Sequence, residues 1–195
     1  MEKNICVYCG SAVGIHPEYA AAASSLGRAL ARHGFGLVYG GGRVGLMGMV
    51  ADAVLEGGGT AIGVIPEPLA VKEVAHDGLT ELHVVADMHQ RKAMMARRAS
   101  AFLTLPGGIG TFEEFFETLS WAMLGLHRKP MGILNVAGYF DPLLALLDHA
   151  VAAGLARSEH LKLLLVSSDP EAAVSDLMVH ALARSPRQPI NFEET

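Results

Sequence analysis

The sequence predicts a single-domain, Rossmann-like α/β protein, in which helices cover both faces of a parallel sheet. Short apolar runs alternate with longer amphipathic segments from the first residues onward, as in proteins built from βαβ units. Two glycine-rich turns each follow an apolar run and precede a helical pattern. The chain has 195 residues, 51% of them hydrophobic, which is enough for one substantial core. We expect the domain to span residues 1–183, followed by a flexible tail at 184–195.

The first half of the chain is expected to contain three strands and two helices. Pro17 suits the first position of a helix, and Gly34 suits its end. A second helix follows a glycine-rich turn and ends near Glu56. The strands are predicted at residues 3–9, 36–39 and 60–65, and the first helix at 17–33.

The second half begins with a polar connection at residues 66–78, and long connections of this kind often act as lids or binding segments. Asp87 is expected to cap a helix, with Gln90 completing a capping box. Asp169 and Pro170 are expected to open the final helix. Further strands are predicted at 81–86, 101–105, 131–135 and 162–167, and further helices at 111–125 and 142–153.

A glycine-rich turn at residues 106–111 joins an apolar strand directly to a helix. The free N–H groups of the first helical turn would point out of the sheet edge, which suits a phosphate or another anion. Glu113, Glu114 and Glu117 are expected in the same turn, where an anion would repel them, so at least one should face a sugar hydroxyl or a reacting carbon. The alternative is structural, because Thr111 and Glu114 also match a capping box. The motif alone does not decide between these interpretations.

A second glycine-rich turn, at residues 40–48, also follows a predicted strand. Gly40, Gly42 and Gly45 have the spacing of the dinucleotide fingerprint, but that motif belongs on the first strand and needs an acidic residue after the next. We therefore infer that backbone approaches a nucleotide here, without inferring NAD. The alternative, glycines needed only for a tight turn, explains one or two of them better than five.

Four basic side chains belong to the helix that Asp87 is expected to cap. Arg91 and Lys92 lie near its start, level with the 106–111 turn, because helices of right-handed βαβ units start at the carboxyl edge of the sheet. Arg97 and Arg98 lie about 10 Å lower, at 1.5 Å per residue. We assign the first pair to the site and the second to a solvated or interface face. An ordinary charged helix surface is the alternative for the first pair.

Composition and charge exclude several functional classes. The net charge of −5 and the pI near 6.0 leave no basic surface for nucleic acid. No apolar run is long enough for a membrane span and the first residues lack a signal-peptide pattern, so we expect a cytoplasmic protein. Cys6 and Cys9 would lie on opposite faces of one strand as core thiols. The nine histidines show no paired metal-ligand spacing. Residues 121–130 and the 111–125 helix carry excess apolar bulk, which predicts a homodimer.

Three motifs together resemble the LOG family, the cytokinin-activating phosphoribohydrolases formerly labelled lysine decarboxylases. They are Met88 to Lys92, Pro106 to Glu114 and Gly40 to Gly48, and the similarity extends to about Leu155. The resemblance implies hydrolysis of the N-glycosidic bond of cytokinin riboside 5′-monophosphates and of AMP, releasing the free base and ribose 5-phosphate. The implied partner is thus a small nucleoside 5′-monophosphate, and no metal or organic cofactor is required.

The resemblance also implies roles for individual residues. Arg91 and Glu114 match the catalytic pair of the family. The positions that match or are expected to hold the nucleotide are Glu73, Lys92, Gly108, Ile109, Gly110, Thr111, Phe112, Glu113, Ser120, Gly41 and Gly42. Three residues depart from the usual pattern: Ser100 replaces Asp, Ser120 replaces Thr, and Ile109 replaces a frequent Tyr.

The implied chemistry agrees with these residue types. Glycosidic cleavage passes through an oxocarbenium-like state, which a carboxylate near the ribose stabilises while it orients or deprotonates water. Glu114 is the expected carboxylate, Glu113 or Glu73 would bind ribose hydroxyls, and the glycine backbone with Thr111 would hold the 5′-phosphate. Arg91 would position the nucleotide or stabilise the leaving base.

Two other functions compete with this one. A non-catalytic nucleotide or cofactor carrier would use the same glycine-rich turns. A PLP-dependent lysine decarboxylase is less well supported, because none of the five lysines has a convincing Schiff-base setting. The sequence leaves open whether plain or prenylated adenine is preferred.

Overall fold

A computed structural model describes residues 3–70 and 75–183, and seven strands within them form one sheet. The order across the sheet is β4-β3-β2-β1-β5-β6-β7, and all neighbouring strands are parallel. The predicted α/β class with a parallel sheet is therefore confirmed. The strands are β1 (Asn4–Tyr8), β2 (Gly36–Tyr39), β3 (Ala61–Pro66), β4 (Glu81–Val85), β5 (Ala101–Thr104), β6 (Met131–Leu134) and β7 (Leu164–Ser167).

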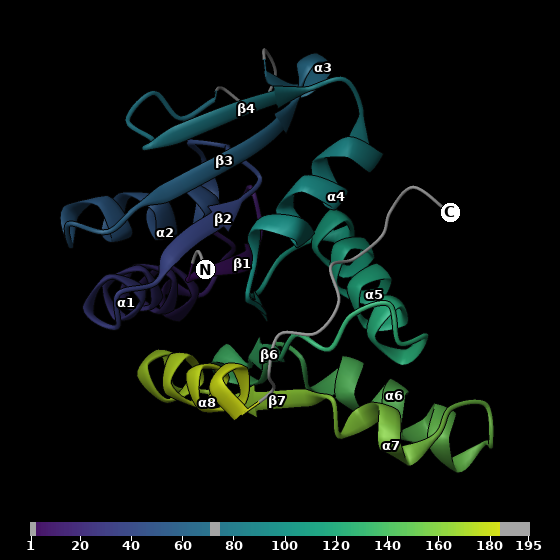
Figure 1. The fold of residues 1–195 in the computed structure, drawn as a ribbon. Coiled ribbons are helices and arrows are strands. Elements are labelled where there is room, and N and C mark those ends of the chain that lie inside the picture. Colours follow the sequence, from purple (N-terminus) through teal and green to yellow (C-terminus); the bar gives the residue numbers. More distant parts are fainter. Residues whose placement is uncertain (1–2, 71–74, 184–195) are drawn as a thin grey trace.

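Helices cover both faces of this sheet (Figure 1). Helices α1, α2 and α8 pack on one face, and α4, α5 and α6 pack on the other. The helices are α1 (Pro17–Arg32), α2 (Gly45–Glu56), α3 (Glu67–Ala70), α4 (Met88–Arg98), α5 (Ile109–Met123), the 3-10 helix η1 (Val136–Gly138), α6 (Asp141–Ala152), α7 (Ser158–Leu161) and α8 (Pro170–Ala183).

Alternate residues of β1 enter two separate cores, because successive side chains of a strand point to opposite faces. Ile5 and Val7 pack under α1 and α2, whereas Cys6 and Tyr8 pack under α4 and α5. Cys9, just beyond the strand, returns to the first core. Both cysteines are buried free thiols on opposite faces, as predicted.

The predicted helix starts are largely confirmed by their side-chain caps. The Oδ1 atom of Asp87 accepts a hydrogen bond from the Gln90 amide at 2.8 Å, and Oδ1 of Asp169 accepts from the Ala172 amide at 2.7 Å. The Gln90 side chain differs from the expected capping box. Its Oε1 accepts from the amide of Ala86, one residue before the cap, at 3.2 Å.

Three short helices, α3, α7 and the 3-10 helix η1, were not expected from the sequence. Helix α3 lies in the polar connection, and α7 precedes β7, which consequently begins at Leu164 rather than at residue 162. Local hydrogen bonds such as His160 N to Arg157 O hold this turn of helix. The tail predicted at 184–195 and the candidate residue Glu73 lie outside the described residues.

The strand order reverses between β1 and β5. Strands β2, β3 and β4 lie on one side of β1, and β5, β6 and β7 lie on the other. The two central strands stay joined just past their carboxyl ends, where the amide of Gly10 donates to the carbonyl of Pro106 at 3.0 Å. Open parallel sheets bind ligands at such a reversal point, so the site should lie above β1 and β5.

Candidate active site

The glycine turn that follows β5 is tightly packed on the side that faces Gly10 and open on the side of Gly108 and Gly110. An added Cβ on Gly107 would lie 2.1 Å from Oγ1 of Thr111 and 2.8 Å from the amide nitrogen of Gly10, so glycine is required there. A Cβ on Gly108 or Gly110 would meet nothing within 4 Å. The first turn of α5 therefore exposes bare backbone, with its unpaired N–H groups, to the open space above the sheet.

Helix α5 begins earlier than a capping box would require. Its N-cap is Gly108, which makes no side-chain cap hydrogen bond, and Ile109 is the first helical residue. Thr111 is thus the third helical residue and does not cap the helix, so the structural interpretation of the Thr111 and Glu114 pair is wrong. Glu113 and Glu114 lie in the second turn and not in the first, which corrects the expected position of the carboxylates. The glycines before Thr111 carry no Cβ, and the chain can enter the helix there without a capping side chain.

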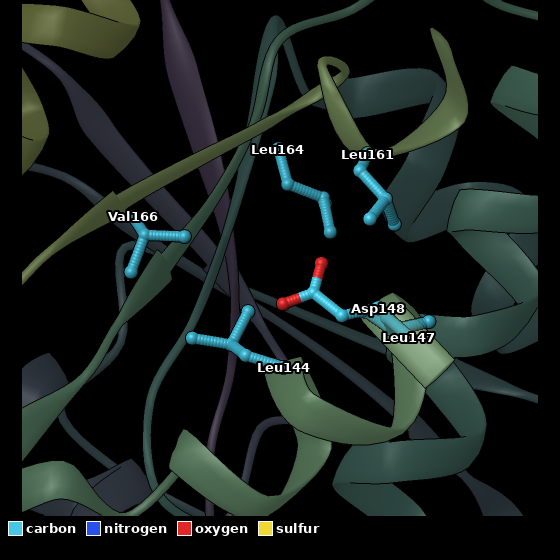
Figure 2. A pocket seen from close by; sticks show the side chains of 6 residues that line it. All are labelled: Leu144, Leu147, Asp148, Leu161, Leu164 and Val166. Atoms are coloured by element: carbon cyan, nitrogen blue, oxygen red, sulfur yellow. The ribbon is translucent and has the colours of Figure 1, made fainter. Parts of the chain in front are cut away.

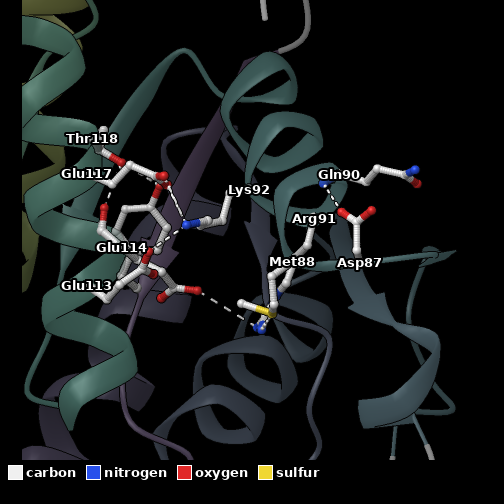
Figure 3. A network of polar contacts seen from close by, with 10 residues as sticks. Asp87, Met88, Gln90, Arg91, Lys92, Glu113, Glu114, Glu117 and Thr118 are labelled. Atoms are coloured by element: carbon white, nitrogen blue, oxygen red, sulfur yellow. Dashed lines mark hydrogen bonds and ion pairs between the residues drawn. The ribbon is translucent and has the colours of Figure 1, made fainter. Parts of the chain in front are cut away.

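Arg91 is a buried guanidinium whose donors are only loosely satisfied. It is 6% exposed, and its Nη2 lies 3.4 Å from the carbonyl oxygen of Gly40, while Nη1 lies 3.7 Å from the sulfur of Met88. Its Nε has no hydrogen-bond partner among the described residues. Oε1 of Glu114 lies 3.9 Å from Nη2, and Figure 3 shows the two side chains turned toward each other. Since buried cations normally find acceptors, this donor capacity suits a polar ligand.

Lys92 is held by two carboxylates of α5. Its Nζ lies 2.5 Å from Oε1 of Glu113 and 3.0 Å from Oε1 of Glu117 (Figure 3). Burial of the ammonium alone would lower its pKa, but the hydrogen bonds to Glu113 and Glu117 outweigh burial and raise the pKa above its ordinary value. Lys92 therefore stays charged between the two carboxylates of α5.

The second glycine-rich turn meets Arg91 through Gly40. Gly41 and Gly42, the two predicted binding residues that follow it, are buried. Part of their backbone is hydrogen-bonded to residues 75–76. The carbonyl of Gly41 accepts from the amide of His76 at 3.0 Å, and Gly42 forms an isolated antiparallel bridge with Ala75. Residues 75–76 thus hold this turn in place, and its contact with Arg91 is the carbonyl of Gly40.

The remaining predicted binding residues differ in their placement. Ile109 is 82% exposed at the start of α5, and the half-buried ring of Phe112 stacks on Tyr139 with centroids 6.4 Å apart. Ser120 is exposed and lies about 14 Å along α5 from Thr111, at 1.5 Å per residue. The fold therefore places Ile109 and Phe112 at the glycine turn and leaves Ser120 away from it.

Tyr139 is a site residue that sequence reasoning missed. Its hydroxyl donates to the carbonyl oxygen of Gly107, and its ring packs edge-on against Tyr19 with centroids 5.6 Å apart. It thereby fixes the glycine turn from a segment beyond β6. The available signal was a pair of aromatic residues, Tyr139 and Phe140, soon after a predicted strand and at the carboxyl edge of the sheet.

A separate pocket of about 250 Å³ lies between α6, α7 and β7 (Figure 2). Its lining is apolar except for one carboxylate, and consists of Leu144, Leu147, Asp148, Leu161, Leu164 and Val166. The pocket lies at the β7 end of the sheet, away from the reversal point. Its lining brings together no acid–base pair and no cation, and so lacks the chemistry of the Arg91–Glu114 pair.

The strand order and the helices on both faces define a doubly wound α/β protein, and the bare helix start and the buried Arg91–Glu114 pair lie at its reversal point, where open parallel sheets bind ligands. The chain belongs to the LOG family: the family model described as "Possible lysine decarboxylase" matches residues 47–177.

Named relatives support the same assignment. The cytokinin riboside 5′-monophosphate phosphoribohydrolase of Rhodococcoides fascians is 51% identical over 174 residues, which cover 89% of this chain and 88% of the relative. The enzyme LOG7 of Arabidopsis thaliana, with the same activity in its name, is 54% identical over 152 residues, which cover 78% and 70%. The predicted family resemblance is thus confirmed.

Similar solved structures include a molybdenum cofactor binding protein from Rippkaea orientalis, with a TM-score of 0.69 and 21% identity. The match covers 94% of this chain and 99% of that protein. The Moco carrier protein of Chlamydomonas reinhardtii matches with a TM-score of 0.68, 22% identity and the same coverage. At this identity these matches establish the fold alone.

Residues 3–70 and 75–183 contain neither a membrane-spanning helix nor a cluster of metal ligands. None of the helices in these ranges is long and apolar enough to cross a membrane. In the same part of the chain, no three His, Cys, Asp or Glu side chains are grouped as metal ligands.

Proposed function

We propose that this protein hydrolyses the N-glycosidic bond of cytokinin riboside 5′-monophosphates and of AMP. The observation that carries the proposal is the buried pair of Arg91 and Glu114, which face each other 3.9 Å apart beside the open first turn of α5. About 50% identity to relatives named for this activity, over most of the chain, supports it.

The reaction follows from the placement of one carboxylate. The bond between the anomeric carbon and the base nitrogen lengthens, and positive charge develops on the ribose. Glu114 stabilises this charge and takes a proton from water, whose oxygen forms the new bond to the anomeric carbon. The base leaves with the bonding electrons and gains a proton. The products are the free base and ribose 5-phosphate.

The other residues of the candidate site bind the nucleotide. The 5′-phosphate lies against the backbone of Gly108, Gly110 and Thr111, where the N–H groups and dipole of a helix start favour an anion. Arg91 donates to the nucleotide or to the leaving base through its guanidinium, whose Nε has no hydrogen-bond partner among the described residues and whose Nη contacts are long. Glu113 is 48% exposed and, with Lys92 charged beside it, can accept from a ribose hydroxyl.

Two further assignments belong to this proposal. Glu73 and Ser120 bind the nucleotide as the family resemblance implies, although Ser120 lies about 14 Å from Thr111 within its own chain. The protein resides in the cytoplasm, which agrees with buried thiols at Cys6 and Cys9 that face separate cores.

We also infer a homodimer through the outer face of α5 and the segment after it. Phe116, Met123, Leu124 and Leu126 are 36%, 40%, 75% and 39% exposed there, a density of apolar surface that favours association. Light scattering should give a dimer mass for the wild type and a monomer mass for Leu124→Glu. The control Leu155→Glu, at a leucine 87% exposed outside this face, should leave the dimer intact. A monomeric wild type would refute the inference.

The decisive experiment incubates the protein with AMP and with isopentenyl-AMP and separates the products by chromatography. Free base and ribose 5-phosphate are expected, with Glu114→Gln as the inactive control. A nucleotide or cofactor carrier would instead bind AMP without releasing base. The same experiment decides between plain and prenylated adenine from the two values of kcat/KM.

The geometry of the lysines argues against a PLP-dependent decarboxylase. Lys92 is engaged by two carboxylates, which keep it protonated and hence not nucleophilic. Lys129 lies two residues before β6, at the opposite edge of the sheet from Arg91 and Glu114, and its Nζ donates to the carbonyl of Ala96 at 2.6 Å. An absorbance scan of the purified protein for bound PLP tests this reading independently.

A further inference from the structure

We propose that Thr118 is a positioning residue for Glu114, and that Tyr8 and His127 hold it in place; the proposal rests on the hydrolytic function above. Thr118 lies one helical turn after Glu114 and is 1% exposed. Its Oγ1 donates to the backbone carbonyl of Glu114 at 2.8 Å. Such a bond to the residue four positions earlier competes with the helix's own bonding and sets the local geometry of the turn.

Tyr8 completes the hydroxyl pair from the sheet. Its hydroxyl lies 2.9 Å from Oγ1 of Thr118, and both residues are buried. Because the single proton of Thr118 goes to Glu114, Tyr8 must be the donor to Thr118. Burial raises the pKa of Tyr8 well above its ordinary value, with smaller contributions from nearby Cys6 and Glu114, so the phenol keeps the proton that it donates.

His127 holds Thr118 from the other side. The amide of Lys129 donates to Nδ1 of His127 at 3.2 Å, which places the ring proton on Nε2. Nε2 then donates to the carbonyl oxygen of Thr118 at 3.0 Å. Burial lowers the pKa of His127, which keeps the neutral ring in this tautomer.

These contacts link the catalytic carboxylate to the centre of the fold. Tyr8 ends β1, the strand beside the reversal point, and Thr118 belongs to the helix that carries Glu114. The helical turn that bears Glu114 is thereby connected to β1, the strand that leads to Gly10 and to its hydrogen bond with the glycine turn at Pro106. These hydrogen bonds therefore fix the position of Glu114 relative to the end of β1, and they also fix the course of α5.

The test compares Thr118→Val, which keeps the shape and removes the hydroxyl, with Thr118→Ser, which keeps the hydroxyl. We expect kcat for AMP to fall about 10- to 50-fold in the first, with KM within about threefold, and to stay within about threefold in the second. The matched control is Ser100→Ala. The hydroxyl of Ser100 also donates to a backbone carbonyl at 2.8 Å, that of Asn4, but at the opposite edge of the sheet. The Ser100→Ala protein should be less stable than the wild type but should keep its kcat.

The Glu114→Gln background separates positioning from a general structural effect. If Thr118 acts through Glu114, adding Thr118→Val there should lower the residual rate by less than about threefold. A full additional loss, or wild-type kcat in Thr118→Val, would overturn the positioning role while leaving the hydrolytic function intact. Absence of base release by the wild type would overturn both. If Thr118→Val is recovered unfolded, Tyr8→Phe removes the donor to Thr118 and should lower kcat without raising KM; an unchanged kcat would overturn the proposal.

Discussion

Nη2 of Arg91 lies 3.9 Å from Oε1 of Glu114, although the two residues come from different helices on the same face of the sheet. Both side chains are largely buried, at 8% and 11% exposure. The distance is too long for a strong hydrogen bond and short enough for a substantial electrostatic attraction. The pair is therefore positioned to admit a ligand without first breaking a close salt bridge.

Glu114→Gln tests the chemical role of this carboxylate. We expect a folded protein whose kcat falls by about 100-fold or more, because glutamine can neither accept a proton from water nor carry a negative charge. The measurement is product release from AMP, with circular dichroism as the check on folding. Since Gly108 and not Thr111 is the N-cap, loss of capping does not explain the effect. An active Glu114→Gln protein would leave the proposed mechanism without its base.

Gly40→Ala tests whether the position of the Arg91 guanidinium matters. An added methyl would lie 2.0 Å from Nη2 of Arg91, so the guanidinium must leave its position opposite Glu114. We expect kcat/KM to fall about 10- to 100-fold with the fold retained. In an Arg91→Met background, Gly40→Ala should lower kcat/KM little further, because the two changes remove the same interaction. Full activity in Gly40→Ala would contradict this role of Arg91.

Gly110→Ala separates helix stability from nucleotide binding. The added methyl meets no protein atom within 4 Å, and alanine in a helix is favoured over glycine by about 0.5–1 kcal/mol. We therefore expect a small increase in the free energy of unfolding together with a several-fold higher KM, because the methyl would occupy space next to the phosphate. Urea titration and steady-state kinetics measure the two effects. An unchanged KM would place the phosphate elsewhere.

Three features were predictable from the sequence: the pattern of strands and helices, the convergence of the turns at the carboxyl edge of the sheet, and the separation of Arg91 from Arg97. They depend on periodicity, on the handedness of βαβ units and on the rise of a helix, which are local or general rules. The sequence also indicated that Lys92 belongs near the glycine turn, and it does lie beside Glu113 there.

The pairing of individual side chains was not predictable. Lys92 contacts Glu113 and Glu117 while Arg91 faces Glu114, a choice set by the rotation of α5 against α4 rather than by spacing in the chain. Tyr139 reaches the turn from beyond β6, and only the folded chain brings them together. The helix start was misjudged because threonine and glutamate match a capping box, whereas a glycine N-cap has no side-chain signature.

Lys129 provides a test of the structure away from the site. Burial lowers its pKa from its ordinary value to about 8, with a smaller opposing effect of Cys6. Between about pH 8 and the higher pKa of the unfolded chain, the unfolded state holds the proton that the folded state has lost. Stability due to this residue must therefore rise with pH across that window.

We expect the free energy of unfolding of the wild type, measured relative to Lys129→Met, to increase by about 1–2 kcal/mol from pH 8 to pH 10, after allowance for partial exposure of the side chain. Urea titration at several pH values measures the difference, and effects common to both proteins cancel. Lys162→Met, at an exposed lysine, is the matched control that isolates the effect of burial. A difference that stays flat or falls between pH 8 and pH 10 would mean that the ammonium group of Lys129 remains hydrated in the folded protein, contrary to its contacts with the carbonyl of Ala96 and the ring of Phe102.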